Sequence, residues 1–452
     1  MTERRLSARE VVARLADDST FAELPHPERQ SGPDGPLAWQ GYGASRARAA
    51  ERTGEEESVV CGTASVTGAR AVLLAFEFGF LGGSLGERTG DRLEAAYAYA
   101  RAHRLPVVPL VATGGSRMQE GMVALTQLQR VARQSALTRE AGLPQIAVLR
   151  DPTTGGGWAT LGAGADVVLA LPGAQVGFAG SRVRPPDADP AAYTAEAQVA
   201  AGAADAVVRP EELREVLGRW LRLLAGSPAQ EAAVPRALGA HDLPATGWDA
   251  VRRARAPRRP RAEAYLDAYF TDRVAIGGDR CGGVDAEGML CGFGAHDGRT
   301  VAYAAQTGTA TRPAGYRTAA RLIRFADRLD VPVLTLVDTP GAANDAEAER
   351  QGVGAAIADL FGAVAAARVP ITTLLIGEGG SGGALALAAP GNTWATPDSY
   401  FSVIAPEWAA AILKRGPEEV EVTADQLRVR PQDLVELGVV RGVVDGPSGS
   451  AP

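Results

Sequence analysis

The sequence has few of the side chains on which enzyme chemistry most often depends. It has four histidines, none of them in a recognisable catalytic motif, and a single lysine, Lys414. Its three cysteines, Cys61, Cys281 and Cys291, form no C-x-x-C pair. Neither a disulfide framework nor a structural zinc site is therefore expected, and catalysis by a histidine base is disfavoured.

Other features that are missing argue against whole classes of protein. The 452 residues contain no apolar run of about 18 residues, so we expect no transmembrane helix. The opening MTERRLSAREVVARL lacks the apolar segment of a secretory signal. The net charge of −7 argues against broad nucleic-acid binding. We therefore expect a cytoplasmic protein that binds neither membranes nor nucleic acid.

Glycine is abundant, with 54 residues, and the glycine-rich segments belong to an internal repeat. Residues 105–115 and 143–166 match residues 331–341 and 369–392 at one constant offset of 226 residues, without a gap. Solenoid repeats have periods of about 20–50 residues, so this much longer period indicates two copies of a domain.

Each copy alternates predicted strands and helices. The short apolar runs VVPLV, IAVLR, VLTLV and TTLLI are typical of buried parallel strands, and each precedes glycines and a helix-forming stretch. Each copy opens with a predicted hairpin, turning at residues 67–68 and 297–298. The pattern predicts an α/β fold with two tandem domains, residues 1–224 and 262–452, joined by a Pro/Ala/Arg-rich linker at residues 225–261.

The predicted linker ends in a run of six arginines between residues 252 and 261. One interpretation is a docking patch for the phosphates of coenzyme A or for an acidic partner. The other is a solvated linker, and the composition favours it.

Two glycine-rich segments, residues 151–160 and 377–386, each join a predicted strand to a small-residue helix. Glycine lets a ligand approach the main chain closely, and the first N–H groups of a helix have no internal partner. Such a turn, at the positive end of the helix dipole, suits an anionic oxygen: an enolate, a tetrahedral oxyanion or a phosphate. No lysine follows either loop, which excludes a P-loop. Glycines that only permit close helix packing are the alternative.

Residues 113–121 and 338–342 also follow strand ends, where ligands of parallel sheets bind. We expect both segments to lie beside the glycine-rich turns. Arg117 could reach a phosphate of coenzyme A, or it could be a helix-start residue paired with Glu120.

At these motifs the chain resembles the carboxyltransferase component of biotin-dependent acyl-CoA carboxylases. More narrowly, it resembles the β and α carboxyltransferase subunits of bacterial acetyl-CoA carboxylase, fused in one polypeptide. The β-like half covers about residues 36–224, in the segments Thr53-GEEESVV, Phe76-EFGFLGGSLG, Gly114-GSRMQEG, Asp151-PTTGG and Val176-GFAGSRV. The α-like half covers about residues 260–446, in the segments Tyr265-LDAYFTD, Pro313-AGYRTAARL, Asp338-TPGA, Ile376-GEGGSGGALAL and Tyr400-FSVIAPE.

The resemblance implies a crotonase-like fold of the ClpP/crotonase superfamily in both halves. It implies an active site between the first domain of one protomer and the second domain of another. Main-chain amides would form two oxyanion holes, one for a thioester enolate and one for the ureido oxygen of biotin; which serves which stays open. Carried to this sequence, the catalytic residues are Gly155, Gly156, Gly157, Gly382 and Gly383. The residues implied in substrate or biotin binding are Gly114, Gly115, Arg117, Phe178, Ala179, Gly180, Gly341, Gly379, Gly380 and Lys414.

The implied reaction moves a carboxyl group from carboxybiotin on a carrier protein to the α-carbon of a short acyl-CoA, acetyl-CoA or propionyl-CoA, through an enolate. Acyl-CoA would bind the first domain and carboxybiotin the second. The chain has no biotin-accepting Met-Lys motif and no ATP-grasp-like glycine loop. The biotin carboxyl carrier protein and the biotin carboxylase are therefore expected as separate chains. The expected assembly is a homo-oligomer, either a dimer or a ring of dimers.

The chain departs from the family at several positions. It lacks the four-cysteine zinc finger of the β subunit, so no zinc is predicted. Trp158 replaces a small hydroxyl residue and would either narrow the acyl pocket or pack against the sheet. The stretch Gln306-TGTATR is shortened, and Ala343-NDAEAERQG lacks the family's Tyr-Pro-Gly. These losses keep two alternatives open: a biotin-independent malonyl-thioester decarboxylase or acyl-transfer enzyme on the same scaffold, and a non-catalytic assembly subunit. Lys414 matches a family lysine near the site, or is a surface residue.

Overall fold

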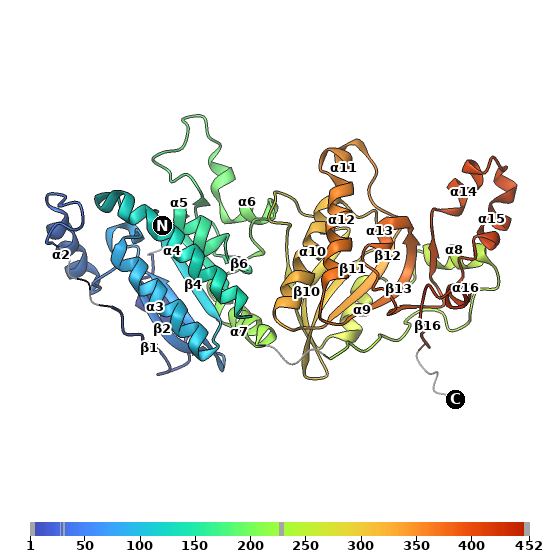
Figure 1. Ribbon diagram of the computed structural model, residues 1–452, viewed down its shortest axis with the longest axis horizontal. Coiled ribbons are helices and arrows are strands. Elements are labelled where there is room, and N and C mark those ends of the chain that lie inside the picture. The colour runs from blue at the N-terminus through green and yellow to red at the C-terminus, as the bar shows by residue number, and fades with distance from the viewer. Residues whose placement is uncertain (1–4, 28, 30–31, 226–229, 447–452) are drawn as a thin grey trace. The chain divides into compact units, whose positions relative to one another are not determined.

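The computed structural model describes residues 5–27, 29, 32–225 and 230–446. The chain divides into two units, Met1–Ala225 and Gly226–Pro452, each with its own sheet (Figure 1). Each unit combines a mixed sheet with helices, which confirms the predicted α/β class. No described helix has both the length and the apolar character needed to cross a bilayer.

The first unit contains an eight-stranded sheet in the order β1-β2-β3-β4-β5-β6-β8, and β7 pairs with β5. Its strands are β1 (Ala22–Glu23), β2 (Val59–Val66), β3 (Ala69–Phe76), β4 (Val107–Thr113), β5 (Ile146–Thr154), β6 (Val167–Ala170), β7 (Val176–Gly177) and β8 (Ala206–Val207). Its helices are α1 (Ala8–Leu15), α2 (Tyr42–Thr53), η1 (Leu81–Gly83), α3 (Glu87–His103), η2 (Met118–Glu120), α4 (Gly121–Glu140), α5 (Gly155–Gly157), the π-turn η3 (Trp158–Gly162), η4 (Pro190–Tyr193), α6 (Ala195–Ala200) and α7 (Leu213–Leu224).

The second unit repeats this plan in the order β16-β14-β13-β12-β11-β10-β9, and β15 pairs with β13. Its strands are β9 (Asp272–Ile276), β10 (Met289–His296), β11 (Arg299–Gln306), β12 (Val333–Thr339), β13 (Ile371–Gly380), β14 (Thr393–Ala395), β15 (Tyr400–Ser402) and β16 (Gly442–Val443). Its helices are α8 (Gly247–Arg255), α9 (Ala262–Tyr269), α10 (Pro313–Arg328), α11 (Ala346–Arg350), α12 (Val353–Ala366), α13 (Ser381–Leu385), α14 (Pro406–Ile412), η5 (Pro417–Glu419), α15 (Val420–Gln426) and α16 (Pro431–Glu436).

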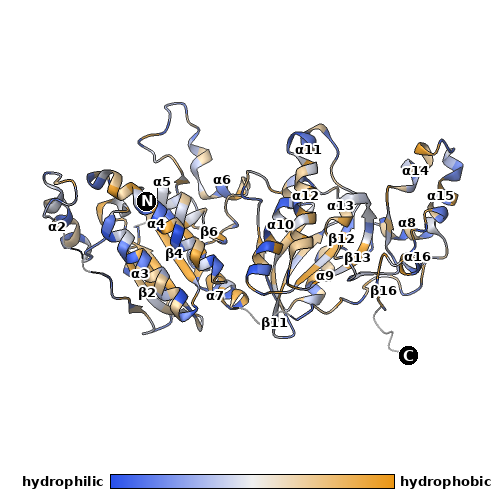
Figure 2. Ribbon diagram, viewed as in Figure 1, coloured by the Kyte–Doolittle hydropathy of each residue, from blue (hydrophilic) through white to orange (hydrophobic). Residues whose placement is uncertain are grey.

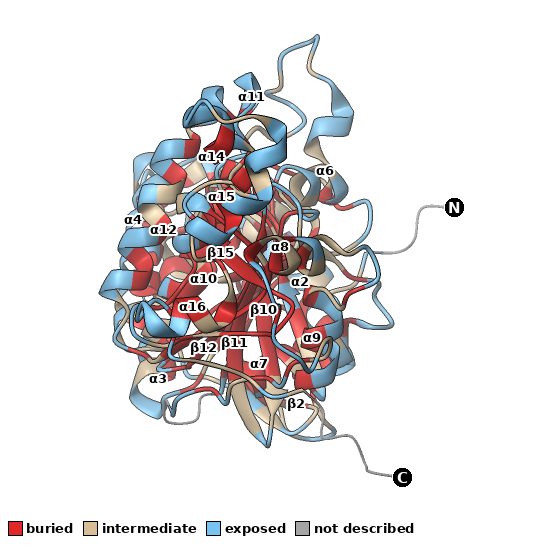
Figure 3. Cartoon of the chain, turned by 90° about the vertical axis from the view of Figure 1, so that its right-hand side faces the viewer, coloured by how far each residue is buried: buried red, intermediate tan, exposed pale blue. Residues whose placement is uncertain are grey.

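The central strands are apolar because they are covered on both faces. Every residue of β4 and of β12 is buried, as parallel strands between helices require. In the first unit α3 packs on β2, β3 and α4, and in the second α10 packs on β10, β11 and α12. Figure 2 shows the apolar strands beneath helices with hydrophilic outer faces, and Figure 3 shows β10, β11 and β12 as buried.

The predicted hairpins are confirmed. Strands β2 and β3 pair antiparallel around Thr67 and Gly68, and β10 and β11 around Asp297 and Gly298. All four turn residues have positive φ, between +47° and +85°. This is the conformation of a two-residue turn that matches the twist of the strands.

The repeat extends to an irregularity in the sheets. The β4–β5 register shifts between Val111 and Thr113, and the β12–β13 register shifts at the matching positions Val337 and Thr339. Beyond the shift, β5 leaves β6 and pairs with β7, while β13 leaves β14 and pairs with β15. In both units the end of this central strand stays paired with β4 or β12 on one side and exchanges its partner on the other, just before the glycines.

Much of the stretch expected to be a linker folds against the second unit. Residues 247–255 form α8, whose Ala250, Val251 and Ala254 are buried in one cluster with Tyr400. Ala232 lies in the core cluster under β12 and β13.

Candidate functional site

The first glycine loop (residues 154–157) is built by main-chain contact with its neighbour. Gly155 has φ +64° and Gly115 has φ +109°, conformations that favour glycine. A Cβ on Gly155 would lie 3.2 Å from the Gly115 Cα. Only a glycine pair lets the two strand ends approach this closely, so the predicted proximity of residues 113–121 to this loop is found.

The second glycine loop (residues 380–383) repeats the arrangement. Ser381 takes the position of Gly155 and has φ +59°. A Cβ on Gly380 would lie 2.0 Å from the Pro340 carbonyl oxygen, and one on Gly383 would lie 2.5 Å from the Ala342 nitrogen. Residues 340–342 therefore lie against this loop through main-chain atoms.

A buried threonine braces each neighbouring strand end. The Thr113 hydroxyl accepts a hydrogen bond from the Gly115 N–H at 3.1 Å, and the Thr339 hydroxyl accepts one from the Gly341 N–H at 3.2 Å. These threonines are 226 residues apart, like the glycine loops, and this offset is a signal in the sequence that identifies them.

The two loops offer main-chain donors, but Gly155 is not one of them. Its N–H donates to the Phe178 carbonyl at 3.1 Å, so the prediction that Gly155 supplies an oxyanion donor is wrong. Among the described residues, no hydrogen bond takes up the N–H groups of Gly156 and Gly157, or those of Gly382 and Gly383. Each loop thus has one pair of adjacent amides without a hydrogen-bond partner among the described residues, and their contact with a ligand stays a prediction.

The helices after the loops are short. The α5 helix has three residues and continues as the π-turn η3, and α13 has five residues. Such short helices carry little macrodipole. The capacity to bind an anion therefore rests on individual N–H groups, not on a long helix.

The loops differ in how crowded they are. A Cβ on Gly156 would lie 2.3 Å from Leu128 Cδ1, and one on Gly157 would lie 2.3 Å from Thr113 Cγ2. A Cβ on Gly382 would meet nothing within 4 Å, whereas Gly383 is buried. The second glycine loop therefore borders open space at Gly382.

The other predicted binding glycines lie around these loops. Exposed Gly114 donates its N–H to the Gly82 carbonyl at 2.9 Å. Half-buried Gly341 contacts the second glycine loop, and buried Gly379 packs against Phe401. A Cβ on Gly180 would lie 3.6 Å from the Thr154 hydroxyl, which places this residue beside the first loop.

Phe178 and Ala179 precede Gly180 in the same segment. Phe178 contacts the first glycine loop through its carbonyl, and the residue is 73% exposed. Ala179 is half-buried. The ring of Phe178 is therefore free to contact a ligand, which stays a prediction.

Arg117 cannot present its guanidinium to a phosphate of coenzyme A, because the side chain is 1% exposed. It forms a salt bridge with both oxygens of Glu57, one at 3.0 Å, and donates to the Ser84 carbonyl at 2.7 Å and the Tyr42 hydroxyl at 3.1 Å. The predicted alternative partner, Glu120, lies 3.5 Å away. Arg117 is thus an internal brace of the segment that carries Gly114 and Gly115.

The charges of this pair stabilise one another. Burial acts to raise the pKa of Glu57, but the Arg117 charge outweighs it and lowers the pKa of that carboxyl. Burial also opposes the Arg117 charge, and Glu57 outweighs it and raises the pKa of the guanidinium. Both groups stay ionised near neutral pH.

The second unit has its own buried pair, at Asp338. This carboxylate is fully buried and accepts from Arg259 Nη2 at 2.6 and 2.7 Å. Arg261 lies 3.4 Å away, and the Glu378 N–H donates to the same carboxylate at 3.1 Å. Burial raises the pKa of Asp338 despite these partners.

Another arginine of the basic run contacts the strand that leads to the second glycine loop. Arg255 contacts Glu378 at 3.1 Å and Glu407 at 2.5 Å, and the Tyr400 hydroxyl donates to Glu378 at 2.8 Å. For Arg255 and Arg259, neither the docking patch nor the solvated linker describes the side chain. Arg255 instead joins Glu378, before the second glycine loop, to Glu407, after it, and Arg259 joins its own segment to Asp338 on β12.

Trp158 faces the interior. It is 8% exposed and packs with Ala147, Leu149 and Ala165 in one apolar cluster. This confirms the interpretation of Trp158 as a packing residue, and a narrowing of the acyl pocket stays a prediction.

Lys414 follows α14, is exposed and has φ +59°. Its N–H donates to the Ala411 carbonyl at 3.0 Å, which ends the helix. Its contact with a ligand stays a prediction.

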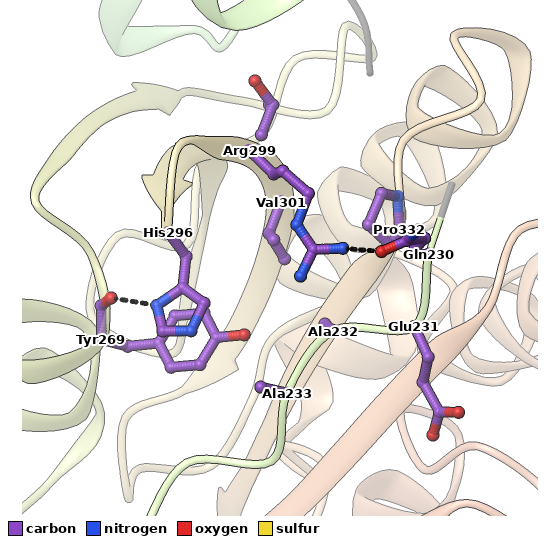
Figure 4. A pocket seen from close by; sticks show the side chains of 10 residues that line it. Gln230, Glu231, Ala232, Ala233, Tyr269, His296, Arg299, Val301 and Pro332 are labelled. Carbon is purple, nitrogen blue, oxygen red and sulfur yellow. Dashed lines mark hydrogen bonds between the residues drawn. The ribbon is translucent and has the colours of Figure 1, made fainter. Parts of the chain in front are cut away.

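Figure 4 shows a small pocket in the second unit that is unrelated to the glycine loops. Its volume is about 10 Å³, room for about one water molecule. The His296 ring stacks on Tyr269 with centroids 3.7 Å apart, and Arg299 bonds to Gln230. Within residues 5–446, apart from the undescribed positions, no group of three or more His, Cys, Asp or Glu could hold a metal ion.

Two duplicated, glycine-lined loops with free amide pairs define a class of enzyme scaffold that stabilises negative oxygen through the main chain. Comparison with known proteins supports this class. Residues 39–203 match the family described as carboxyl transferase domain, and residues 242–452 match the family described as acetyl co-enzyme A carboxylase carboxyltransferase-like.

Curated relatives cover nearly the whole chain. An acetyl-coenzyme A carboxylase carboxyl transferase subunits beta/alpha protein of Saccharopolyspora erythraea is 38% identical, over 99% of this chain and 82% of that protein. A probable biotin-dependent acyl-coenzyme A carboxylase beta3 subunit of Mycobacterium tuberculosis is 34% identical, over 89% and 83%. Our chain belongs to the carboxyltransferase family of biotin-dependent acyl-CoA carboxylases, which confirms the resemblance.

Solved structures share the fold. Transcarboxylase 12S, described with methylmalonyl-coenzyme A bound and as a hexamer, has a TM-score of 0.79 at 21% identity, over 98% of this chain and 87% of that chain. A single-chain, multi-domain long-chain acyl-CoA carboxylase has a TM-score of 0.74 at 20% identity, over 98% and 45%.

Proposed function

We propose that the protein transfers a carboxyl group from carboxybiotin, carried by a separate protein, to the α-carbon of a short acyl-CoA. The observation that supports this most strongly is the pair of free amides in each glycine loop: Gly156 with Gly157, and Gly382 with Gly383. One pair would hold the thioester oxygen and the other the ureido oxygen of biotin. Main-chain donors fixed in this way are worth most where negative charge develops.

The main-chain amides that hold the thioester oxygen would stabilise negative charge on it. The α-carbon of the acyl group would then be more acidic and, once deprotonated, would act as the nucleophile. None of the four histidines lies on either glycine loop or on the neighbouring strand ends. No histidine base is thus positioned there, and in this proposal the ureido nitrogen of biotin, once it has released the carboxyl group, would take the α-proton. Carboxybiotin, when bound, supplies the carboxyl group. The open space beside Gly382 fits a ligand that approaches the main chain closely.

We further propose that the protein works as a homo-oligomer that combines the first unit of one protomer with the second unit of another. In the first unit, Met118 is 80% exposed and Met122 is 67% exposed, with Leu125, Leu37 and Trp39 also exposed. Large exposed apolar side chains on a soluble enzyme indicate an interface. Sedimentation velocity should show a dimer or a ring of dimers, and a monomer at micromolar concentration would refute the proposal.

Three further parts of the proposal go with this reaction: a biotin carboxyl carrier protein and a biotin carboxylase act as separate partner chains, the acyl group is acetyl or propionyl, and the protein works in the cytoplasm. Mixing this chain with candidate carrier and carboxylase subunits and measuring ATP-dependent carboxylation of acetyl-CoA and propionyl-CoA tests the first two.

The central test measures CO2 release from malonyl-CoA with and without biocytin. Release that biocytin stimulates supports the carboxyltransferase. Release independent of biocytin would instead support a biotin-independent decarboxylase. No release in either condition, from folded protein at its native oligomeric state, would point to an assembly subunit without catalysis.

A further inference from the structure

The carbonyl of Gly383 is withdrawn from the hydrogen bonding of its own helix. In a regular α-helix it would accept from the N–H four residues later. Here the Leu387 N–H donates to the Ala384 carbonyl at 3.2 Å, although Ala386 N–H still donates to Gly382 at 3.0 Å. The Gly383 carbonyl is therefore free for partners outside the helix.

Two buried side chains take up that carbonyl. Gln306, the last residue of β11, donates to it from Nε2 at 3.1 Å, and the Tyr316 hydroxyl on α10 donates to it at 3.1 Å. Both residues are fully buried. Gln306 Nε2 also lies 3.4 Å from the hydroxyl of Thr311, itself fully buried.

Fixing this carbonyl restricts the glycine pair beside it. Adjacent glycines can rotate whole peptide units at low cost, because neither carries a Cβ. The peptide unit is planar and trans, so a fixed Gly383 carbonyl also fixes the opposite direction of the Ala384 N–H. The two donors thus fix the peptide plane that follows the Gly383 Cα, and the plane before it, which carries the Gly383 N–H, is held through the Gly382 carbonyl by the Ala386 N–H.

We propose that Tyr316 and Gln306 are positioning residues for the second glycine loop: they act on the reaction only by holding the Gly383 carbonyl. This inference rests on the proposed carboxyl transfer. Pre-organised donors accelerate a reaction because they need not reorient as charge develops. Neither side chain touches the substrate in this scheme, so substrate affinity should change little when one is removed.

The first glycine loop shows no such arrangement. Within the described part of the chain, the carbonyl of Gly157, which matches Gly383, accepts no side-chain hydrogen bond. The nearby Thr160 hydroxyl donates to Gly156 instead, at 2.8 Å. The positioning pair therefore belongs to the second unit, and its loss should affect the ligand bound there.

The experiment compares Tyr316→Phe with the control Tyr303→Phe in the full chain. Tyr303 is also buried, on β11, and its hydroxyl donates to the Val274 carbonyl at 3.3 Å. Both variants lose one buried hydroxyl and its hydrogen bond to a main-chain carbonyl, but only Y316F loses a donor to Gly383. Gln306→Met removes the second donor at nearly constant length and serves as an independent variant if Y316F does not fold.

Biocytin-stimulated CO2 release from malonyl-CoA gives the rate. We expect kcat of Y316F and of Q306M to fall between about 10- and 100-fold, as small misplacement of catalytic donors does, with KM for malonyl-CoA within about twofold of wild type. Y303F should keep kcat within about twofold. Equal kcat in Y316F and wild type, or an equal fall in Y303F, would overturn the inference.

Hydrogen exchange separates this inference from the proposed function. Amides of residues 381–387, followed by mass spectrometry, should exchange faster in Y316F than in Y303F. If the wild type has no activity, the carboxyltransferase proposal fails, and unchanged exchange in Y316F would overturn the positioning role by itself.

Discussion

Replacing Arg259 by methionine removes the main counter-charge of Asp338, a fully buried carboxylate. Breaking one side of a buried ion pair typically costs about 3–5 kcal/mol. Arg261 lies 3.4 Å from the same carboxylate and is 40% exposed, so it compensates only in part. We therefore expect R259M to lose about 3 kcal/mol, a large share of the roughly 5–15 kcal/mol by which domains are stable.

Arg258 supplies the matched control. It is the neighbouring residue, it is exposed, and no ion pair or hydrogen bond holds it among the described residues. Arg258→Met makes the same chemical change one position away, and we expect it to stay within about 0.5 kcal/mol of wild type.

Urea unfolding followed by tryptophan fluorescence measures both variants. The second-unit transition of R259M should move to lower urea, and that of R258M should not. Biocytin-stimulated decarboxylation should also fall in R259M, because Arg259 fills the space beside Gly377, where a Cβ would lie 2.3 Å from Arg259 Nη2. If R259M is as stable as R258M, the ion pair between Arg259 and Asp338 does not stabilise the second unit as described.

The pH dependence of stability supplies an independent check, because the direction of the change is fixed by the pKa of Asp338. Burial already raises the pKa of Asp338 with Arg259 present. Without Arg259 this pKa should rise further, so the folded state would bind a proton that the unfolded state releases. Stability of R259M should therefore increase relative to wild type as pH falls, because a protonated Asp338 needs no counter-charge. A difference in unfolding free energy between wild type and R259M that stays constant between pH 7 and pH 5 would contradict this account.

Other substitutions test the remaining contacts. Gly156→Ala would place a Cβ 2.3 Å from Leu128 Cδ1, so we expect CO2 release to fall at least about tenfold; adding Leu128→Ala should restore most of the rate by making room, and a fully active G156A would contradict the role of this loop. Glu57→Gln leaves Arg117 buried without its carboxylate and should cost about 3 kcal/mol at pH 7. Because Arg117 lowers the pKa of Glu57, the extra stability of wild type over E57Q should be lost as pH falls below about 4. The difference in unfolding free energy between the two proteins, measured as a function of pH, should therefore become smaller. Trp158→Ala should lower stability by about 3–5 kcal/mol in thermal or urea unfolding but leave KM for malonyl-CoA unchanged; a changed KM would show that the indole lines the pocket after all.

Much of the fold could be predicted because it depends on local patterns. Continuous apolar runs indicate buried parallel strands, and the dipeptides Thr-Gly and Asp-Gly indicate the two-residue turns. The constant offset then extends each identification to its copy. The change of partner by β5 and β13 could not be predicted, because β7 and β15 have only two and three residues.

The sequence predicted the glycine loops of the site but not the buried ion pairs that support them. Adjacent glycines after a strand mark a close main-chain approach whatever the partner is. The roles of Arg117 and Arg259 depend on Glu57 and Asp338, which lie 60 and 79 residues away in sequence. No local pattern separates an arginine with such a distant buried partner from a solvated one. For the same reason, the sequence could not show that Phe178 takes up the Gly155 amide.

The attachment of residues 231–255 to the second unit has a consequence for dividing the gene. The Thr372 hydroxyl donates to the Ala232 carbonyl at 2.9 Å, and the Ala237 N–H donates to Asp445 at 3.1 Å. A fragment that begins at residue 262 would lack these contacts. It would also expose the apolar surface at Tyr400 and Val429 against which α8 packs. Separately expressed halves that are meant to recombine should therefore be cut just after residue 225, so that the arginine-rich stretch stays with the half whose strands it steadies.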